Sequence, residues 1–337
     1  MRNERDLRTE REIQKVTELI VRVKQIARGF EKAIFNSAQS PETERYKLTT
    51  HAVADLVRAL REIDLEIGDN KDLKNGLREI FRLELQPLCL RGPLWNHALT
   101  KPYGYPGDFE ILNAIYKNIF MTKDPVGYEL DRAFLTSSLA EAVRNRKTAI
   151  VAILSEKIRL IGKSYVKMLD LGCGPCTDVE ELVAFRSFES YLSIVCVDHE
   201  QEALDFAKNR VGQKVQKDFD ISYIKANALR LKTLPHAPFD IIWSVGLLDY
   251  IPDQLAYRAI RNWWRIINNG GVFLLTVKDR NKYDPTFYDW MANWIFIPRT
   301  EEQLIALLLK ALKITENQLE VRRDKTGIII IVVATKS

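Results

Sequence analysis

A turn with two glycines follows a short apolar segment in the second half of the chain, and its residues could bind a ligand. It reads Asp170-Leu-Gly-Cys-Gly-Pro-Cys176. Gly172 and Gly174 would let a ligand approach the backbone closely, and the Asp170 carboxylate can accept hydrogen bonds from an ammonium group. A dinucleotide fingerprint would place a third glycine where Thr177 stands. The turn therefore favours an amino-acid-bearing ligand over a pyrophosphate, with a purely structural strand-to-helix turn as the alternative.

Polar residues also follow the next two apolar segments. Asp198 ends the segment 191–197, and a carboxylate in that position can accept both hydroxyls of a ribose diol. Asn227 follows the segment 221–225, and its amide could bind an adenine edge. In open α/β sheets ligands bind outside the carboxyl ends of the strands, so we expect Asp170, Asp198 and Asn227 to share one site.

Two cysteines in the glycine turn allow a different interpretation. Cys173-Gly-Pro-Cys176 has the spacing of a thioredoxin-like redox motif, and a helix N-terminus would lower the pKa of its thiol. The pair lies inside a ligand-binding turn, however, and no aromatic residue precedes it in the thioredoxin manner. Because Cys89 and Cys196 form no second close pair along the chain, we expect no zinc site.

The periodicity of apolar residues divides the chain into two halves. Apolar residues recur at three- and four-residue steps through residues 1–160, for example at Ile13, Val16 and Ile20, which predicts helices. After Gly162 short apolar segments alternate with helical ones, which is typical of a parallel sheet with crossover helices. The strands are expected near residues 166–171, 191–197, 221–225, 239–244, 272–277, 318–323 and 328–334.

These motifs, in this order, resemble those of class I S-adenosylmethionine-dependent methyltransferases. The resemblance covers residues 162–337 and implies a seven-stranded α/β sheet in the order 3-2-1-4-5-7-6, with strand 7 antiparallel. It implies a helical N-terminal substrate or lid domain at 1–160 and a cofactor domain at 161–337. It also implies S-adenosyl-L-methionine as the cofactor, in contact with Asp170, Gly172, Gly174, Cys176, Asp198, His199, Asn227, Ala228, Ser244, Val245 and Gly246. Cys176 stands where the family usually has a third glycine.

Other residues could complete the site. Asp249 and Tyr250 follow the fourth strand and are candidate catalytic residues, although an acid that enters a helix before a packed tyrosine is equally ordinary. Arg146 could pair with the cofactor carboxylate or lie on a solvated helix face.

Tyrosines outside the motifs are further candidates. The rigid loop 101–108 contains Tyr105, a candidate cofactor contact, and Tyr103, which with Tyr250 and Tyr283 is expected to contact substrate. The alternatives are an interhelix turn for the loop and core packing for Tyr283.

Composition and charge argue against several classes of protein, among them nucleic-acid-binding and membrane-spanning proteins. The excess of 50 basic over 45 acidic residues is spread over both halves, so nucleic-acid binding is not favoured. The charged N-terminus lacks a signal peptide, and the longest apolar run, 327–334, is too short to cross a bilayer. We expect a cytoplasmic methyltransferase without a metal, acting on a small or lipophilic acceptor. A protein or RNA methyltransferase and a non-catalytic sensor or scaffold are the alternatives, and the oligomeric state is open.

Overall fold

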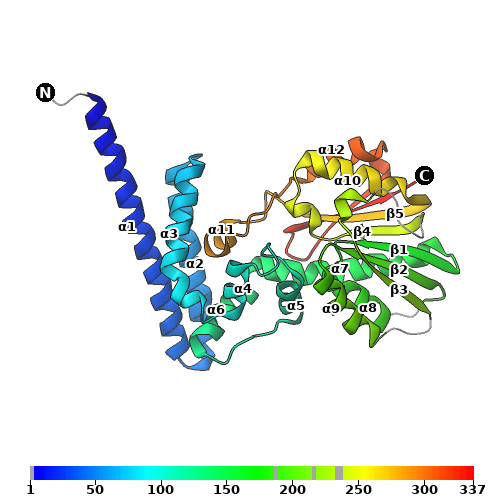
Figure 1. Ribbon diagram of the computed structural model, residues 1–337, viewed down its shortest axis with the longest axis horizontal. Helices are drawn as coiled ribbons and strands as arrows, with labels where there is room; N and C mark the ends of the chain where they lie inside the picture. The colour runs from blue at the N-terminus through cyan, green and yellow to red at the C-terminus, as the bar shows by residue number, and fades with distance from the viewer. Residues whose placement is uncertain (1–3, 186–187, 215–217, 232–237) are drawn as a thin grey trace. The chain divides into compact units, whose positions relative to one another are not determined.

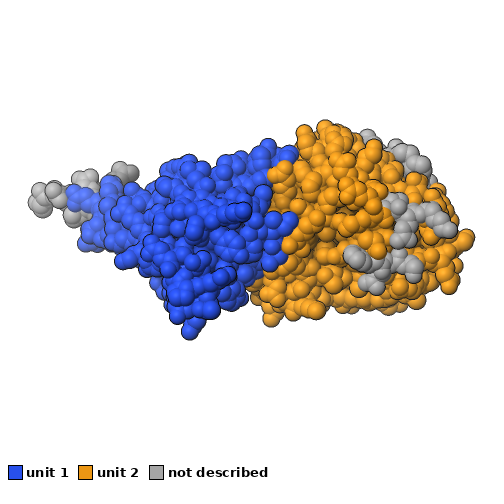
Figure 2. Space-filling model, turned by 90° about the horizontal axis from the view of Figure 1, so that it is seen from below, with its two compact units in different colours: residues 1–107, 118–137, 284–295 blue, residues 108–117, 138–283, 296–337 orange. Residues whose placement is uncertain are grey.

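The computed structural model describes residues 4–185, 188–214, 218–231 and 238–337, and it divides into two compact units. Unit 1 comprises residues 1–107, 118–137 and 284–295, and unit 2 comprises residues 108–117, 138–283 and 296–337 (Figure 2). Among the helices of the described residues, none combines the length and the apolar character needed to cross a membrane.

Unit 1 is a bundle of helices, as the periodicity predicts. Its helices are α1 (Glu4–Gln39), α2 (Glu42–Ile67), α3 (Lys71–Cys89), α4 (Pro93–Thr100), α6 (Pro125–Leu135) and α11 (Thr286–Ala292). Trp95 is fully buried at its centre and packs edge-on against Phe134 at 4.9 Å and Phe287 at 5.0 Å between ring centroids. Edge-to-face aromatic pairs of this kind add to the energy of burial.

Unit 2 contains a seven-stranded sheet in the order β3-β2-β1-β4-β5-β7-β6, which confirms the predicted topology (Figure 1). Strand β7 runs antiparallel to both of its neighbours. The strands are β1 (Tyr165–Leu171), β2 (Tyr191–Asp198), β3 (Phe219–Lys225), β4 (Phe239–Ser244), β5 (Ile267–Lys278), β6 (Leu319–Arg323) and β7 (Ile329–Thr335).

Helices cover both faces of this sheet. α10 (Asp253–Arg265) and α12 (Glu301–Leu312) lie on one face, and α7 (Ser138–Ile161), α8 (Thr177–Phe185) and α9 (Gln201–Gly212) lie on the other (Figure 1). The unit also contains α5 (Phe109–Lys117) and the short 3-10 helices η1 (Ala228–Arg230), η2 (Leu247–Tyr250) and η3 (Glu316–Gln318).

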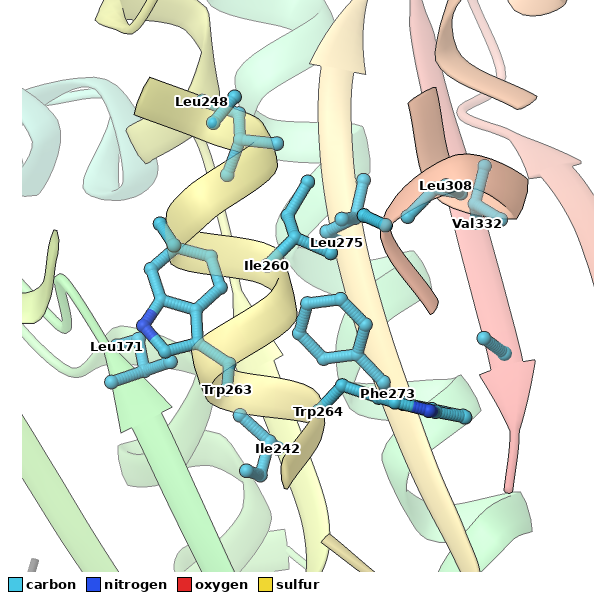
Figure 3. Packing of buried hydrophobic residues seen from close by; sticks show 14 of the residues in the cluster. Leu171, Ile242, Leu248, Ile260, Trp263, Trp264, Phe273, Leu275, Leu308 and Val332 are labelled. Atoms are coloured by element: carbon cyan, nitrogen blue, oxygen red, sulfur yellow. The ribbon is translucent and has the colours of Figure 1, made fainter. Parts of the chain in front are cut away.

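The core on the α10 face shows why these strands are almost continuously apolar. Ile260 and Trp263 of α10 lie over Phe273 and Leu275 of β5 (Figure 3). The indole N–H of Trp263 donates to the Ala228 carbonyl at 2.9 Å, so its polar atom is satisfied inside the core. A sheet with both faces covered needs apolar residues at successive positions rather than in alternation.

The two units do not divide at residue 160. Helices α5 and α7 belong to the unit that contains the sheet, whereas α11 belongs to the helical unit although it follows β5 in the chain. The reason lies in packing: α7 contacts α8, β5 and β7, and Trp290 of α11 packs edge-on against Phe81 of α3 at 5.5 Å.

Candidate functional site

The glycine turn lies between β1 and α8 and is held against the end of β2. Gly172 and Gly174 adopt φ values of 72° and 50°, which favour glycine. The N–H groups of Gly172 and Cys173 donate to the Val197 carbonyl at 2.9 and 3.1 Å. The Gly174 N–H donates to Oδ2 of Asp198 at 2.8 Å. These bonds fix the turn beside the acid that ends β2, at the point where the strand order reverses between β1 and β4.

Asp170 is a buried carboxyl group with an unsatisfied oxygen. Its side chain is 2% exposed, and Oδ2 has no hydrogen-bond partner. Burial, followed by the nearby groups of Asp178, Cys196 and Asp198, raises the pKa of Asp170 well above its ordinary value. A cation that reached Oδ2 would satisfy this oxygen and favour the ionised form. The position therefore fits an ammonium group, as the sequence predicts.

Asp198 is buried at the end of β2 and is held by several donors. Oδ1 accepts the Glu200 N–H at 3.1 Å and lies 3.1 Å from Nδ1 of His199. Burial opposes ionisation, but hydrogen bonds from His199 and from the N–H groups of Glu200 and Gly174 lower the pKa of Asp198 overall. A carboxylate has about four lone-pair sites, and these three donors leave one of them for a ligand hydroxyl, so a second hydroxyl would replace one of the donors.

Asn227 and Ala228 follow β3, where the sequence predicts an adenine contact. The amide oxygen of Asn227 accepts the Leu229 N–H at 2.9 Å and caps η1. Because this oxygen is used, the NH2 group of the exposed Asn227 is the part that suits a ligand acceptor. The Ala228 carbonyl is bonded to Trp263, so this residue holds the turn on the core.

Arg146 lies against the turn that follows β4. A Cβ atom at Gly246 would lie 2.8 Å from Nη1 of Arg146, and Gly246 has a φ of 84°. Arg146 is 3% exposed and donates to the Tyr116 hydroxyl at 3.0 Å, while its Nε atom has no partner. The same turn is fixed by a hydrogen bond from Ser244 Oγ to the Leu171 carbonyl at 2.9 Å. Arg146 therefore lies in the core beside this turn and not on a solvated face.

Asp249 forms a buried ion pair. Oδ2 lies 2.7 Å from Nζ of Lys278, and Oδ1 accepts the Lys278 N–H at 2.8 Å. The two side chains are 1% and 3% exposed. Both oxygens of Asp249 are thus bonded inside the core, an arrangement that suits positioning of β5 better than removal of a proton. The catalytic roles of Asp249 and Tyr250 stay predictions.

Tyr250 and Tyr283 meet at Phe296. Their ring centroids lie 5.3 and 5.6 Å from that of Phe296, and Nζ of Lys278 lies 3.6 Å from the same centroid. Tyr250 is 37% exposed and Tyr283 is buried. In this aromatic group, Tyr250, Tyr283 and Phe296, Tyr250 is the exposed member and the other two rings are buried behind it.

A narrow hollow of about 30 Å³ adjoins the glycine turn. Val245 lines it, as do Leu112 and Tyr116 of α5 and Asp178 at the start of α8. The carboxylate of Asp178 accepts the indole N–H of Trp243 at 2.9 Å. Leu112, Tyr116 and Asp178 were not among the predicted site residues. Nothing in the local sequence of α5 shows that it lies beside the glycine turn.

The predicted tyrosines of loop 101–108 lie in unit 1. The ring of Tyr103 lies 6.4 Å from that of His97, and Tyr105 is partly buried. The loop leads to Asp108, whose Oδ1 accepts N–H groups from the first turn of α5. The cofactor contact of Tyr105 and the substrate contact of Tyr103 stay predictions.

The cysteines are arranged differently from what their spacing suggested. Cys196 of β2 lies beside the Cys173 and Cys176 pair, and all three thiols are buried and reduced. Asp170 is the neighbour of Cys196 in the strand register. The expectation of no zinc site rested on the spacing of Cys89 and Cys196 along the chain, which does not show that Cys196 lies beside Cys176.

The chain is similar to known methyltransferases. Residues 168–271 match a family model described as a methyltransferase domain. Two demethylmenaquinone methyltransferases from Leptospira interrogans, of serovars copenhageni and Lai, are each 28% identical over 132 residues. These residues are 39% of this chain and 50% of each relative, so the chain spans about half the length of the curated relatives it matches.

The chain is also similar to solved structures at low sequence identity. A possible exported protein from Bordetella parapertussis superposes with a TM-score of 0.57 and 16% identity, over 94% of this chain and 96% of that chain. A magnesium protoporphyrin IX methyltransferase from Synechocystis PCC 6803, with bound S-adenosylmethionine, gives a TM-score of 0.43 and 11% identity, over 60% and 85%. The residues that match the family model lie in unit 2, and the sheet of this unit has the strand order that the resemblance implied.

Proposed function

We propose that unit 2 transfers a methyl group from S-adenosyl-L-methionine to a small or lipophilic acceptor. The observation that carries the proposal is the pair of acids at the strand ends. Asp170 has a buried oxygen without a partner, and Asp198 is joined to the same turn through Gly174. These groups suit the ammonium and the ribose diol of one ligand.

Each part of the cofactor has a suitable residue in unit 2. Asp170 would accept the ammonium group, and the buried guanidinium of Arg146 would pair with the carboxylate. Asp198 would accept the ribose hydroxyls, while the NH2 group of Asn227 and the ring of His199 would contact the adenine. When bound, the cofactor supplies a methyl group already activated on sulfur.

The chain's own residues then have to hold the acceptor in line with that methyl group. The exposed ring of Tyr250, which packs against the buried Phe296, would contact a flat or lipophilic acceptor. Asp249 would fix the position of the Phe296 ring through Lys278, because Nζ of Lys278 bonds to Asp249 and lies over that ring. The names of the Leptospira relatives, which refer to a quinone acceptor, support the same class.

Calorimetry with S-adenosylhomocysteine tests the cofactor site. We expect the wild type to bind it and Asp198→Ala to bind roughly 10 to 100-fold more weakly, because hydrogen bonds to a charged group contribute about 1.5–3 kcal/mol. The control is Asp205→Ala, which removes an exposed acid from α9 of the same unit. Absence of binding by the wild type, or equal affinities for the wild type and Asp198→Ala, would overturn the assignment.

The acceptor requires a separate experiment. The protein is incubated with methyl-labelled cofactor and a cell extract divided into small-molecule, lipid, protein and RNA fractions. Label in the small-molecule or lipid fraction supports the proposal, and label confined to protein or RNA contradicts it. Cofactor binding with no labelled product in any fraction would indicate the non-catalytic sensor instead.

A further inference from the structure

Three thiols and one carboxyl group converge beneath the glycine turn. Cys173 and Cys176 come from the turn, and Cys196 and Asp170 come from neighbouring positions of β2 and β1. All four side chains are buried, and Cys176 and Cys196 are fully so. The pairing of β1 with β2 thus brings Cys196 to the other three side chains, which lie at least 20 positions earlier in the chain.

The distances within this cluster suit a single metal ion. A carboxylate oxygen of Asp170 and the sulfur atoms of Cys176 and Cys196 lie within 4.8 Å of one another. The Cys173 thiol, which donates to the Gly174 carbonyl at 3.9 Å, is buried in the same turn and would be the fourth ligand. With Zn–S bonds of about 2.3 Å, the sulfurs of a tetrahedral site lie about 3.8 Å apart. Small side-chain rotations within the cluster would therefore bring the ligands to bonding distance.

The identity of the donors selects the kind of ion. Thiolates bind soft or borderline cations such as Zn²⁺ and Cd²⁺, whereas Mg²⁺ and Ca²⁺ prefer sites made of oxygen ligands. The Oδ2 atom of Asp170 has no hydrogen-bond partner, so it is available to a cation that reaches the cluster. A Zn²⁺ ion bound to three sulfurs and this carboxylate would be four-coordinate.

We propose that the thiol cluster, Cys173, Cys176, Cys196 and Asp170, binds a thiophilic divalent cation, and that this ion excludes the cofactor from Asp170. Each coordinating thiol releases its proton to solvent as its sulfur binds the metal. The exclusion rests on the proposed function, because the ion and the cofactor ammonium would both need the Asp170 carboxylate. Metal binding itself does not depend on that function. The cluster would make methyl transfer sensitive to free zinc.

Titration with Cd²⁺ tests metal binding directly. In a phosphine reductant, we expect the ultraviolet sulfur-to-cadmium charge-transfer band to rise and saturate at about one equivalent. Cys196→Ser should reduce the band strongly. The matched control is Cys89→Ser, which removes the one remaining cysteine, a buried thiol in unit 1. No band in the wild type, or equal bands in the wild type and Cys196→Ser, would overturn the proposal.

Calorimetry with S-adenosylhomocysteine then tests the exclusion. We expect saturating Zn²⁺ to weaken binding at least tenfold in the wild type and to leave binding by Cys196→Ser unchanged. Equal affinity with and without Zn²⁺ in the wild type would refute the exclusion. A cadmium band in a protein that never binds S-adenosylhomocysteine would refute the proposed function and leave the metal site standing.

Discussion

Disrupting the buried ion pair between Asp249 and Lys278 tests whether Asp249 positions β5 or acts as a catalytic base. Asp249→Asn keeps the shape of the side chain and an oxygen that can accept the Lys278 N–H, but it removes the negative charge. The variant must then either bury an unpaired ammonium group or fold with Lys278 neutral. A catalytic base would behave differently, because its loss lowers the rate of methyl transfer and leaves stability unchanged.

The loss in the free energy of unfolding for Asp249→Asn is set by whichever folded form, with Lys278 charged or neutral, has the lower free energy. Burial already lowers the pKa of Lys278, and the lysine of the unfolded chain has a pKa near 10.5. At about 1.4 kcal/mol per pH unit, folding with Lys278 neutral costs about 5 kcal/mol at pH 7 and about 2 kcal/mol at pH 9. The unfolded variant binds one proton more than the folded variant, so its stability rises with pH over this range. The value at pH 7 matches the 3–5 kcal/mol typical of a broken buried pair.

Urea denaturation at several pH values provides the measurement, and hydrogen exchange of β4 and β5 peptides assigns the change to unit 2. The control is Asp253→Asn, which removes an acid whose side chain is 73% exposed and ion-paired to Arg299. We expect it to cost about 1 kcal/mol or less at every pH. A loss below about 1 kcal/mol for Asp249→Asn at pH 7, or a loss independent of pH, would refute the reasoning.

Two further predictions concern the turns around the site. Gly246→Ala would place a Cβ atom 2.8 Å from Nη1 of Arg146 at a residue with positive φ, so it should weaken binding of S-adenosylhomocysteine in calorimetry. The control is Gly270→Ala, which has a similar φ but open space around the new Cβ atom and should leave binding unchanged. The hydrogen bond to Asp198 raises the pKa of His199, so its stabilising effect is full below about pH 6.5 and disappears as the pH rises through the raised value. His199→Gln should therefore be destabilised relative to the wild type at about pH 5.5 and not at about pH 9, and equal differences in thermal melts at both pH values would contradict this.

The sequence by itself was enough to predict the candidate site residues that lie at the carboxyl ends of strands. Asp170, Asp198 and Asn227 each follow an apolar segment, and parallel strands place their carboxyl ends along one edge of the sheet. Local periodicity was enough to find these segments, since a buried strand and an amphipathic helix have different apolar repeats. The predicted strand order followed from the resemblance carried by the same residues and is confirmed by the pairing in the structure.

Only the tertiary structure decided which distant segments meet. Arg146 contacts the turn at Gly246, Asp249 pairs with Lys278, and Cys196 joins the thiols of the glycine turn. These contacts join residues between 20 and 100 positions apart. Such a contact depends on how elements pack and leaves no pattern in the local sequence, because the partner of a buried charge or thiol is chosen by the geometry of the whole core. The same reason places α11 in the helical unit, although its sequence follows β5.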